Sequence, residues 1–174
     1  MSGVPKQLTN KELATLAGEI FEPILKSEGL FLEEINCEVH SKERFLTVYV
    51  DRITPINLDE IAAVSRLLSN QIDSDPRFGD APFNFEVTTP GLERPLTLPR
   101  HWKKNEHRLV RIITVAGSEI KGRIGDSDDS AVEIDGKKIS YAQIKRALIE
   151  IEFKSTASKQ TSNKRSNEIK IEGN

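Results

Sequence analysis

The sequence predicts an α+β protein in two parts: a two-layer N-terminal domain of order helix-strand-strand-helix-strand, followed by a small all-β barrel. Three observations support this fold class. Two long segments repeat apolar residues with the period of amphipathic helices, and three shorter segments beside them alternate as strands do. From about His107 onward, short segments rich in Val and Ile are separated by tight turns. Acidic residues dominate positions 1–90, whereas basic residues dominate positions 91–174.

Both predicted helices have clear start signals. Thr9 is followed three residues later by Glu12, which is a capping box, and Gly29 is a stop signal after the apolar stripe. Asn57 and Glu60 form the same arrangement before the second helix. Two amphipathic helices need a sheet face to cover, so we expect a helical layer on a sheet.

The strands are predicted from alternation and from turn residues. In the first part we expect strands over 34–40, 45–50 and 83–88, the first two forming a hairpin. Asp135-Gly136 is a tight-hairpin signal in the second part, and one helical turn fits residues 141–145. The five strands expected there cover residues 109–115, 118–124, 131–134, 138–141 and 148–153. Five short strands with tight turns indicate a small barrel.

These elements divide the chain of 174 residues into three segments. Residues 1–97 are predicted to form the α+β domain, and residues 98–153 the barrel. Residues 154–174 are polar, with almost no apolar side chains, so we expect a disordered tail.

Composition excludes several classes of protein. A formal net charge of −2 argues against coating nucleic acid by bulk charge. A single cysteine, Cys37, excludes an internal disulfide and a multi-cysteine zinc site. We see no signal peptide and no apolar run of membrane-spanning length, and we therefore expect a soluble cytoplasmic protein with no membrane contact.

Catalytic and metal-binding patterns are also missing. The sequence has no HExxH, CxxC, Walker loop or GxSxG pattern, and we expect surface roles for its three histidines. Alternation with Ile35 and Val39 places Cys37 on an apolar strand face, where a buried, unreactive thiol is expected. We interpret the aspartates of 126–129 as a solvated turn and not as a metal site. Gly122-Arg-Ile-Gly125 matches the GxxG loop of KH domains, but its apolar residues favour a strand. The sequence thus predicts neither an enzyme nor a cofactor.

A basic stretch is the strongest physical indication of function. The stretch from Arg94 to Arg111 contains six Lys and Arg residues and a single acidic residue, Glu106. Such density favours phosphate contacts or an acidic partner, although an ordinary solvated connection would also explain it. Trp102 could stack on a base, but we favour a packing anchor. The candidate RNA- or ribosome-binding residues are Arg94, Arg100, Lys103, Lys104, Arg108 and Arg111, extended by Lys121 and Arg123.

One motif in this region is more specific. We expect Pro90-Gly91 at the centre of a type II turn that joins the two domains. We expect this motif to set the geometry between the two domains rather than to contact RNA. It consists of Thr88, Thr89, Pro90, Gly91, Leu92, Glu93, Arg94 and Pro95. It resembles the Val-Ser-Ser-Pro-Gly-Leu-Asp-Arg-Pro-Leu signature of the bacterial ribosome maturation factor RimP family. Threonines stand here for the two serines, and Glu93 stands for the aspartate.

Weaker similarities to the RimP family agree in order and spacing over about residues 10–153. They are Leu46-Thr-Val-Tyr-Val-Asp51, Val64-Ser-Arg66 and Ile144-Lys-Arg-Ala-Leu148. The chain departs from the family at Asn105-Glu106-His107, where the family often has a glycine that opens the first barrel strand.

The resemblance implies a fold and a function. It implies an α+β domain followed by an SH3-like or Sm-like barrel. It also implies a non-enzymatic factor without a cofactor, which supports maturation of the 30S ribosomal subunit and processing of 16S ribosomal RNA (16S rRNA). The expected partner is the immature 30S subunit, through 16S rRNA and, by way of the barrel, a small-subunit ribosomal protein. We expect a cytoplasmic monomer. The alternative is a general module that binds RNA or single-stranded nucleic acid.

Overall fold

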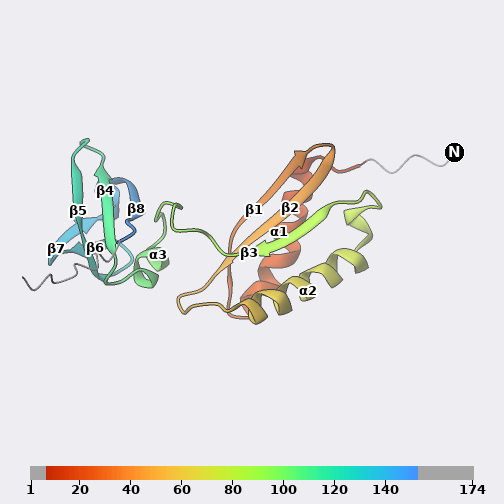
Figure 1. Ribbon diagram of the computed structural model, residues 1–174, viewed down its shortest axis with the longest axis horizontal. Helices are drawn as coiled ribbons and strands as arrows, with labels where there is room; N and C mark the ends of the chain where they lie inside the picture. The colour runs from red at the N-terminus through yellow and green to blue at the C-terminus, as the bar shows by residue number, and fades with distance from the viewer. Residues whose placement is uncertain (1–6, 153–174) are drawn as a thin grey trace, which may run out of the picture.

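The computed structural model describes residues 7–152 and contains two sheets, each with its own hydrophobic core (Figure 1). A three-stranded sheet of order β1-β2-β3 comes first, and a five-stranded sheet of order β7-β6-β5-β4-β8 follows. The two sheets lie at opposite ends of the long axis, and the chain after β3 joins them (Figure 1). The predicted tail of residues 154–174 lies outside the described residues.

The first part has the predicted order helix-strand-strand-helix-strand. Its elements are α1 (Asn10–Ser27), β1 (Phe31–His40), β2 (Glu43–Asp51), α2 (Leu58–Ser74), a 3₁₀ turn (Pro76–Phe78) and β3 (Asn84–Thr88). Both predicted capping boxes are present, at Thr9 and at Asn57. Helix α1 ends before Gly29, whose φ of 71° is the left-handed conformation that glycine favours.

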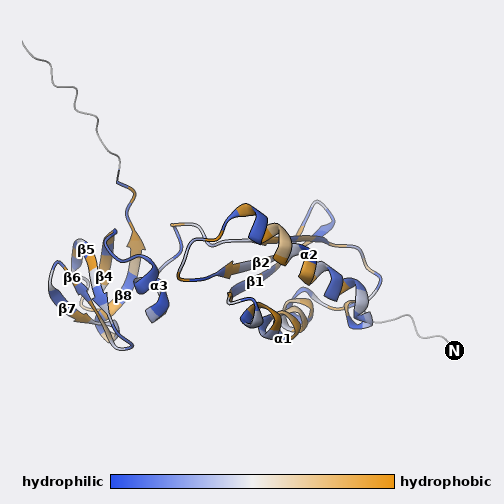
Figure 2. Cartoon of the chain, turned by 90° about the horizontal axis from the view of Figure 1, so that it is seen from below, coloured by the Kyte–Doolittle hydropathy of each residue, from blue (hydrophilic) through white to orange (hydrophobic). Residues whose placement is uncertain are grey.

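Both helices cover one face of the first sheet. Leu46, Val48 and Val50 of β2 are fully buried in a core that also contains Leu13 and Phe21 of α1. Apolar and polar residues alternate along α1 and α2, as expected for helices with one buried side (Figure 2). The intervening residues of β2 point to the opposite face, which is only partly buried. Strand β1 pairs with β2 antiparallel, whereas β3 pairs with β2 parallel.

The second part is mostly antiparallel sheet. Its elements are α3 (Pro99–Lys104), β4 (Leu109–Thr114), β5 (Glu119–Ser127), β6 (Ala131–Ile134), β7 (Lys137–Ser140), a 3₁₀ turn (Tyr141–Gln143) and β8 (Ile144–Ile149). Asp135 and Gly136 both have positive φ between β6 and β7, which confirms the predicted tight hairpin. Within the described residues β7 and β8 are not paired with each other, so a closed barrel is not confirmed.

One prediction for this part was wrong in detail. The last strand begins at Ile144 and not at residue 148, because residues 144–149 pair along β4 directly after a single 3₁₀ turn. A short helix that the sequence analysis did not predict, α3, begins at Pro99. Trp102 on this helix is 1% exposed and stacks on Tyr141 at 5.8 Å between ring centroids. This confirms that Trp102 is a packing anchor.

Candidate functional site

The structure separates the predicted basic residues into two groups. The junction set, Arg94, Arg100 and Lys104, lies between the two sheets and pairs with carboxylates of the first sheet. The surface set lies on α3, on the loop that follows it, and on the outer side of β4 and β5. Its members are Lys103, Arg108, Arg111, Lys121 and Arg123.

Glu33 is the centre of the junction. Its side chain is 4% exposed, and its Oε1 accepts hydrogen bonds from Arg100 Nε at 2.9 Å and Arg100 Nη2 at 2.8 Å. Oε2 lies 2.9 Å from His101 Nε2. Burial opposes ionisation of Glu33, but the hydrogen bonds from His101 and Arg100 and the positive charge of Arg100 outweigh it and lower the pKa of Glu33 to about 2. Glu33 is therefore a buried, ionised anchor at neutral pH.

His101 is held in one orientation by both ring nitrogens. Its Nδ1 accepts hydrogen bonds from the backbone N–H groups of Thr97 at 3.1 Å and Leu98 at 3.2 Å. The ring proton of the neutral imidazole therefore lies on Nε2, which donates to Glu33. The side chain is 11% exposed, so the expectation of a surface role for this histidine was wrong. The expectation failed because alternation and charge do not reveal a partner from a distant strand.

Arg94 and Arg100 each combine an ion pair with an aromatic contact. Arg94 pairs with Glu34, and its guanidinium carbon lies 5.1 Å from the centroid of Tyr49. The guanidinium carbon of Arg100 lies 4.7 Å from the centroid of Phe31. Such stacking adds a cation–π attraction to the charge pairing. The junction set thus joins the two parts of the protein through polar and aromatic contacts.

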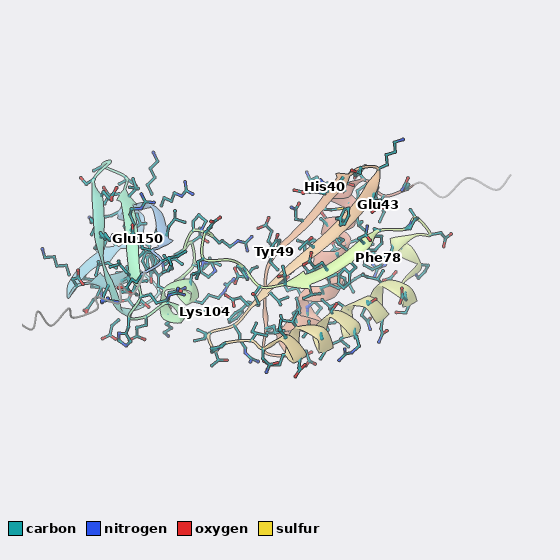
Figure 3. All side chains as sticks on the ribbon, in the orientation of Figure 1. His40, Glu43, Tyr49, Phe78, Lys104 and Glu150 are labelled. Atoms are coloured by element: carbon teal, nitrogen blue, oxygen red, sulfur yellow. The ribbon has the colours of Figure 1, made fainter. Side chains whose placement is uncertain are left out.

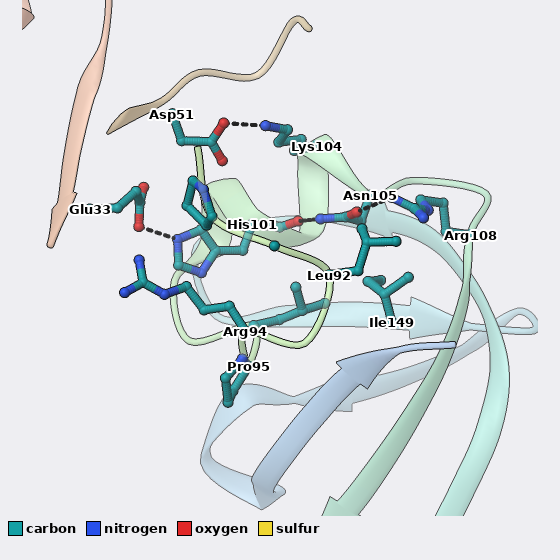
Figure 4. A pocket seen from close by; sticks show the side chains of 13 residues that line it. Glu33, Asp51, Leu92, Arg94, Pro95, His101, Lys104, Asn105, Arg108 and Ile149 are labelled. Atoms are coloured by element: carbon teal, nitrogen blue, oxygen red, sulfur yellow. Dashed lines mark hydrogen bonds and ion pairs between the residues drawn. The ribbon is translucent and has the colours of Figure 1, made fainter. Parts of the chain in front are cut away.

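The last member of the set is a lysine at the end of α3. Lys104 pairs with Asp51 at the end of β2, a carboxylate that is itself buried. A cavity of about 150 Å³ lies between the two sheets at this point, and its lining includes Asp51, Pro90, Arg94 and Arg108. Figure 4 shows the hydrogen bond between His101 and Glu33 and the ion pair between Lys104 and Asp51. Residues of the motif and of the junction set therefore line the same cavity.

A β-bulge explains how Glu33 reaches the junction. Leu32 pairs with Val50 and Glu34 pairs with Tyr49, so Glu33 has no opposite residue on β2. Sequence reasoning missed Glu33, although a signal existed. The inward apolar residues Leu32 and Ile35 are three positions apart and not two, which indicates one inserted residue between them. Asp51 was also missed, and no sequence signal distinguishes it from other residues at strand ends.

The motif forms a turn, but not the predicted one. The backbone N–H of Arg94 donates to Gly91 O at 3.2 Å, so Leu92 and Glu93 occupy the centre of the turn. Gly91 does not have the positive φ that the second central position of a type II turn requires. The prediction of Pro90-Gly91 at the centre was therefore wrong. Because Leu96 N–H donates to Ala147 O at 3.0 Å, the motif is fixed to the second sheet immediately after the turn.

The surface set lies beside two glutamates, the partly buried Glu150 and the exposed Glu152. Arg111 is opposite Lys121 across β4 and β5, and both cations contact Glu150. Arg123 pairs with Glu152 at 2.5 Å. The two remaining members, Arg108 and Lys103, lie before β4. Arg108 Nη1 donates to Asn105 Oδ1 at 3.1 Å, and Lys103 is exposed. In the part of the chain that the structure describes, Lys103 has no ion-pair partner.

The described residues contain little that could support catalysis. Burial raises the pKa of the Cys37 thiol, the opposite of what a nucleophilic cysteine needs, and Cys37 packs against the first core. Within residues 7–152, no group of His, Cys, Asp and Glu is arranged to hold a metal ion. Asp128 instead closes its turn by accepting from the backbone N–H groups of Ser130 and Ala131. Gly122 and Gly125 lie inside β5, which confirms a strand and not a KH loop.

Comparison with protein families identifies the first part of the chain. Residues 20–93 match the model of the RimP N-terminal domain. This match supports the RimP family for the first part of the chain. The matched range runs from within α1 through β3 and includes Glu33, Asp51 and the motif up to Glu93. RimP proteins are ribosome maturation factors and are not known as an enzyme family. Among residues 7–152, no helix has the length and apolar character needed to cross a membrane.

Proposed function

We propose that this RimP-family protein is a non-enzymatic assembly factor that binds the immature 30S subunit and supports maturation of its 16S rRNA. The match of residues 20–93 to the RimP N-terminal domain carries this proposal. The proposal includes a cytoplasmic monomer that needs no cofactor and that contacts both 16S rRNA and a small-subunit ribosomal protein.

The surface set is the proposed RNA contact. Opposite residues on neighbouring antiparallel strands are about 5 Å apart, so Arg111 and Lys121 present two adjacent positive charges. The side chains of Arg111 and Lys121 are 47% and 54% exposed, so water screens their ion pairs with the partly buried Glu150, and phosphate oxygens can replace the carboxylate at little cost. Trp102 is buried and does not offer a stacking surface. We therefore propose phosphate contacts and not base recognition.

The proposed role of the junction set is to hold two binding surfaces in one relative orientation. Arg100 and Lys104 of the second part, and Arg94 of the linking motif, pair with carboxylates of β1 and β2. Two weak surfaces held in a fixed geometry gain effective concentration only on a particle that presents both targets. In this proposal residues 1–97 and 98–153 are the two domains. The strand order β7-β6-β5-β4-β8 is compatible with an SH3-like or Sm-like barrel for the second domain.

Co-sedimentation with ribosomal particles tests the proposal. Immature 30S, mature 30S and 50S subunits are each mixed with the protein across a salt series from 50 to 200 mM. We expect selective binding to the immature 30S subunit that weakens as salt displaces the phosphate contacts. Equal binding to all particles and to unrelated RNA would replace the proposal with a general nucleic-acid-binding module.

A further inference from the structure

One face of the first sheet is covered by neither α1 nor α2. The outward positions of its three strands include Glu34, Glu38, Glu43 and Glu86, together with the aromatic residues Phe45 and Tyr49. None of the outward positions on these strands carries Lys or Arg. Figure 3 labels His40, Glu43 and Tyr49 along the hairpin of β1 and β2. This open face is acidic and aromatic, in contrast to the surface set on the second sheet.

Two arginines of the chain itself contact β1 and β2 of this sheet. Arg100 meets the ring of Phe31 and the carboxylate of Glu33, and Arg94 meets Tyr49 and Glu34. In both cases one guanidinium contacts an aromatic ring and a glutamate of β1 at the same time. The planar guanidinium suits this combination, because it can stack on a ring while its edge donates to a carboxylate.

A third pair of a glutamate and an aromatic residue on this sheet is not contacted by an arginine of the described residues. Glu38 is opposite Phe45 across β1 and β2, as Glu34 is opposite Tyr49. The ring of His40 lies edge-on to Phe45 at 5.6 Å, and its Nε2 lies 2.8 Å from Glu38 Oε2. The side chains of His40 and Glu38 are both more than half exposed, so this contact is easily displaced.

Further carboxylates surround this third pair. Glu86 on β3 lies opposite Thr47, beside Phe45, and has no ion-pair partner among residues 7–152. Glu43 at the start of β2 accepts a hydrogen bond of 3.3 Å from Asn84. Negative charge therefore approaches the partly buried ring of Phe45 from all three strands.

We infer that Phe45, Glu38 and Glu86 form a docking site for an arginine of an extended, arginine-rich segment of a partner protein. The carboxylates exclude nucleic acid, because they would repel phosphate groups. Phe45 and Tyr49 are four residues apart on one strand, a distance of about 13 Å at 3.3 Å per residue, so a segment running along the hairpin would meet the site beside Arg94. This inference does not rest on the proposed function, since it concerns the open face of the first sheet and not the surface set on the second part.

Fluorescence anisotropy with the full-length protein tests the site. The probe is a labelled 12-residue peptide of alternating arginine and serine, and a second peptide carries lysine in place of arginine. Glu38→Gln/Glu86→Gln removes two charges from the site, and Glu19→Gln/Glu22→Gln removes two from exposed positions on α1 as the matched control. We expect about five- to tenfold weaker binding for the first variant and less than twofold for the control.

Two further measurements separate this site from general charge attraction. Phe45→Leu keeps the apolar contact but removes the aromatic face, so we expect weaker binding of the arginine peptide and little change for the lysine peptide. Equal losses in the two charge variants, or no measurable binding to the unmodified protein, would overturn the inference. Sedimentation velocity that shows a dimer disrupted by Glu38→Gln/Glu86→Gln would also overturn it, because the occupant would then be a second copy of the chain.

Discussion

Glu33→Gln removes the charge at the centre of the junction while keeping the size of the side chain. The pKa of Glu33 falls from 4.5 to about 2 in the folded protein, which corresponds to about 3 kcal/mol in favour of the ionised form. Glutamine still accepts one hydrogen bond from Arg100. We therefore expect the free energy of unfolding at pH 7 to fall by about 2–3 kcal/mol.

Urea unfolding followed by tryptophan fluorescence measures this effect, because the only tryptophan, Trp102, lies next to His101 on α3. Glu93→Gln is the matched control, since Glu93 is exposed and has no ion-pair partner within residues 7–152. We expect a change below about 0.5 kcal/mol for the control.

The pH dependence gives a second, independent readout. The folded pKa of Glu33 is lower than its ordinary value, so its stabilising contribution is present above about pH 4.5 and is lost as the pH falls towards 2. The difference between the unmodified protein and Glu33→Gln should therefore shrink by more than half between pH 7 and pH 3. Equal stability of the two proteins at pH 7, or a difference that does not change with pH, would refute this account of the junction.

Three further predictions concern single positions. Gly122→Ala should lower the free energy of unfolding by about 1–3 kcal/mol, because its Cβ would lie 2.6 Å from Ile134 Cγ2. Gly91→Ala is the control, since its Cβ would meet open space, and it should leave thermal denaturation unchanged. His107→Gly should raise the melting temperature slightly, because His107 has a φ of 67° that glycine adopts without strain. Cys37 should react with iodoacetamide more slowly at pH 8 than free cysteine does, because burial raises its thiol pKa; an equal rate would contradict this.

The first part of the fold was predictable because each element carries a local signal. Thr9 and Asn57 begin their helices with capping boxes, and the alternation in β2 places Leu46, Val48 and Val50 on the buried face. These signals depend on neighbours within a few residues. The parallel pairing of β3 with β2 was not predicted, since it joins segments that are about 40 residues apart.

The site was less predictable, because the role of each cation depends on contacts between segments that are distant in the sequence. The stretch Arg94 to Arg111 is basic in sequence, but Arg94, Arg100 and Lys104 are paired with carboxylates that lie more than 50 residues earlier. Charge density locates the cations in the sequence but does not show which of them face solvent. His107, directly before the first strand of the second part, adopts a left-handed conformation that its residue type does not reveal.

The same separation changes which residues should be substituted in a test of RNA binding. Reversing the charge of Arg94, Arg100 or Lys104 would break the junction, so a loss of binding would have two explanations. Lys103, Arg111 and Lys121 are exposed and make at most a surface ion pair, so their reversal should leave the fold intact. Their matched control is a set of three exposed cations on the first part, Lys26, Lys42 and Arg66.

Binding of these two triple variants to immature 30S subunits is the most direct test of the proposed function. Both variants, Lys103→Glu/Arg111→Glu/Lys121→Glu and Lys26→Glu/Lys42→Glu/Arg66→Glu, are compared with the unmodified protein by co-sedimentation at 100 mM salt. We predict at least about tenfold weaker binding for the first variant, unchanged binding for the second, and the same melting temperature for all three proteins. Unchanged binding of the first variant, or equal losses in both, would contradict the assignment of the surface set as the RNA contact.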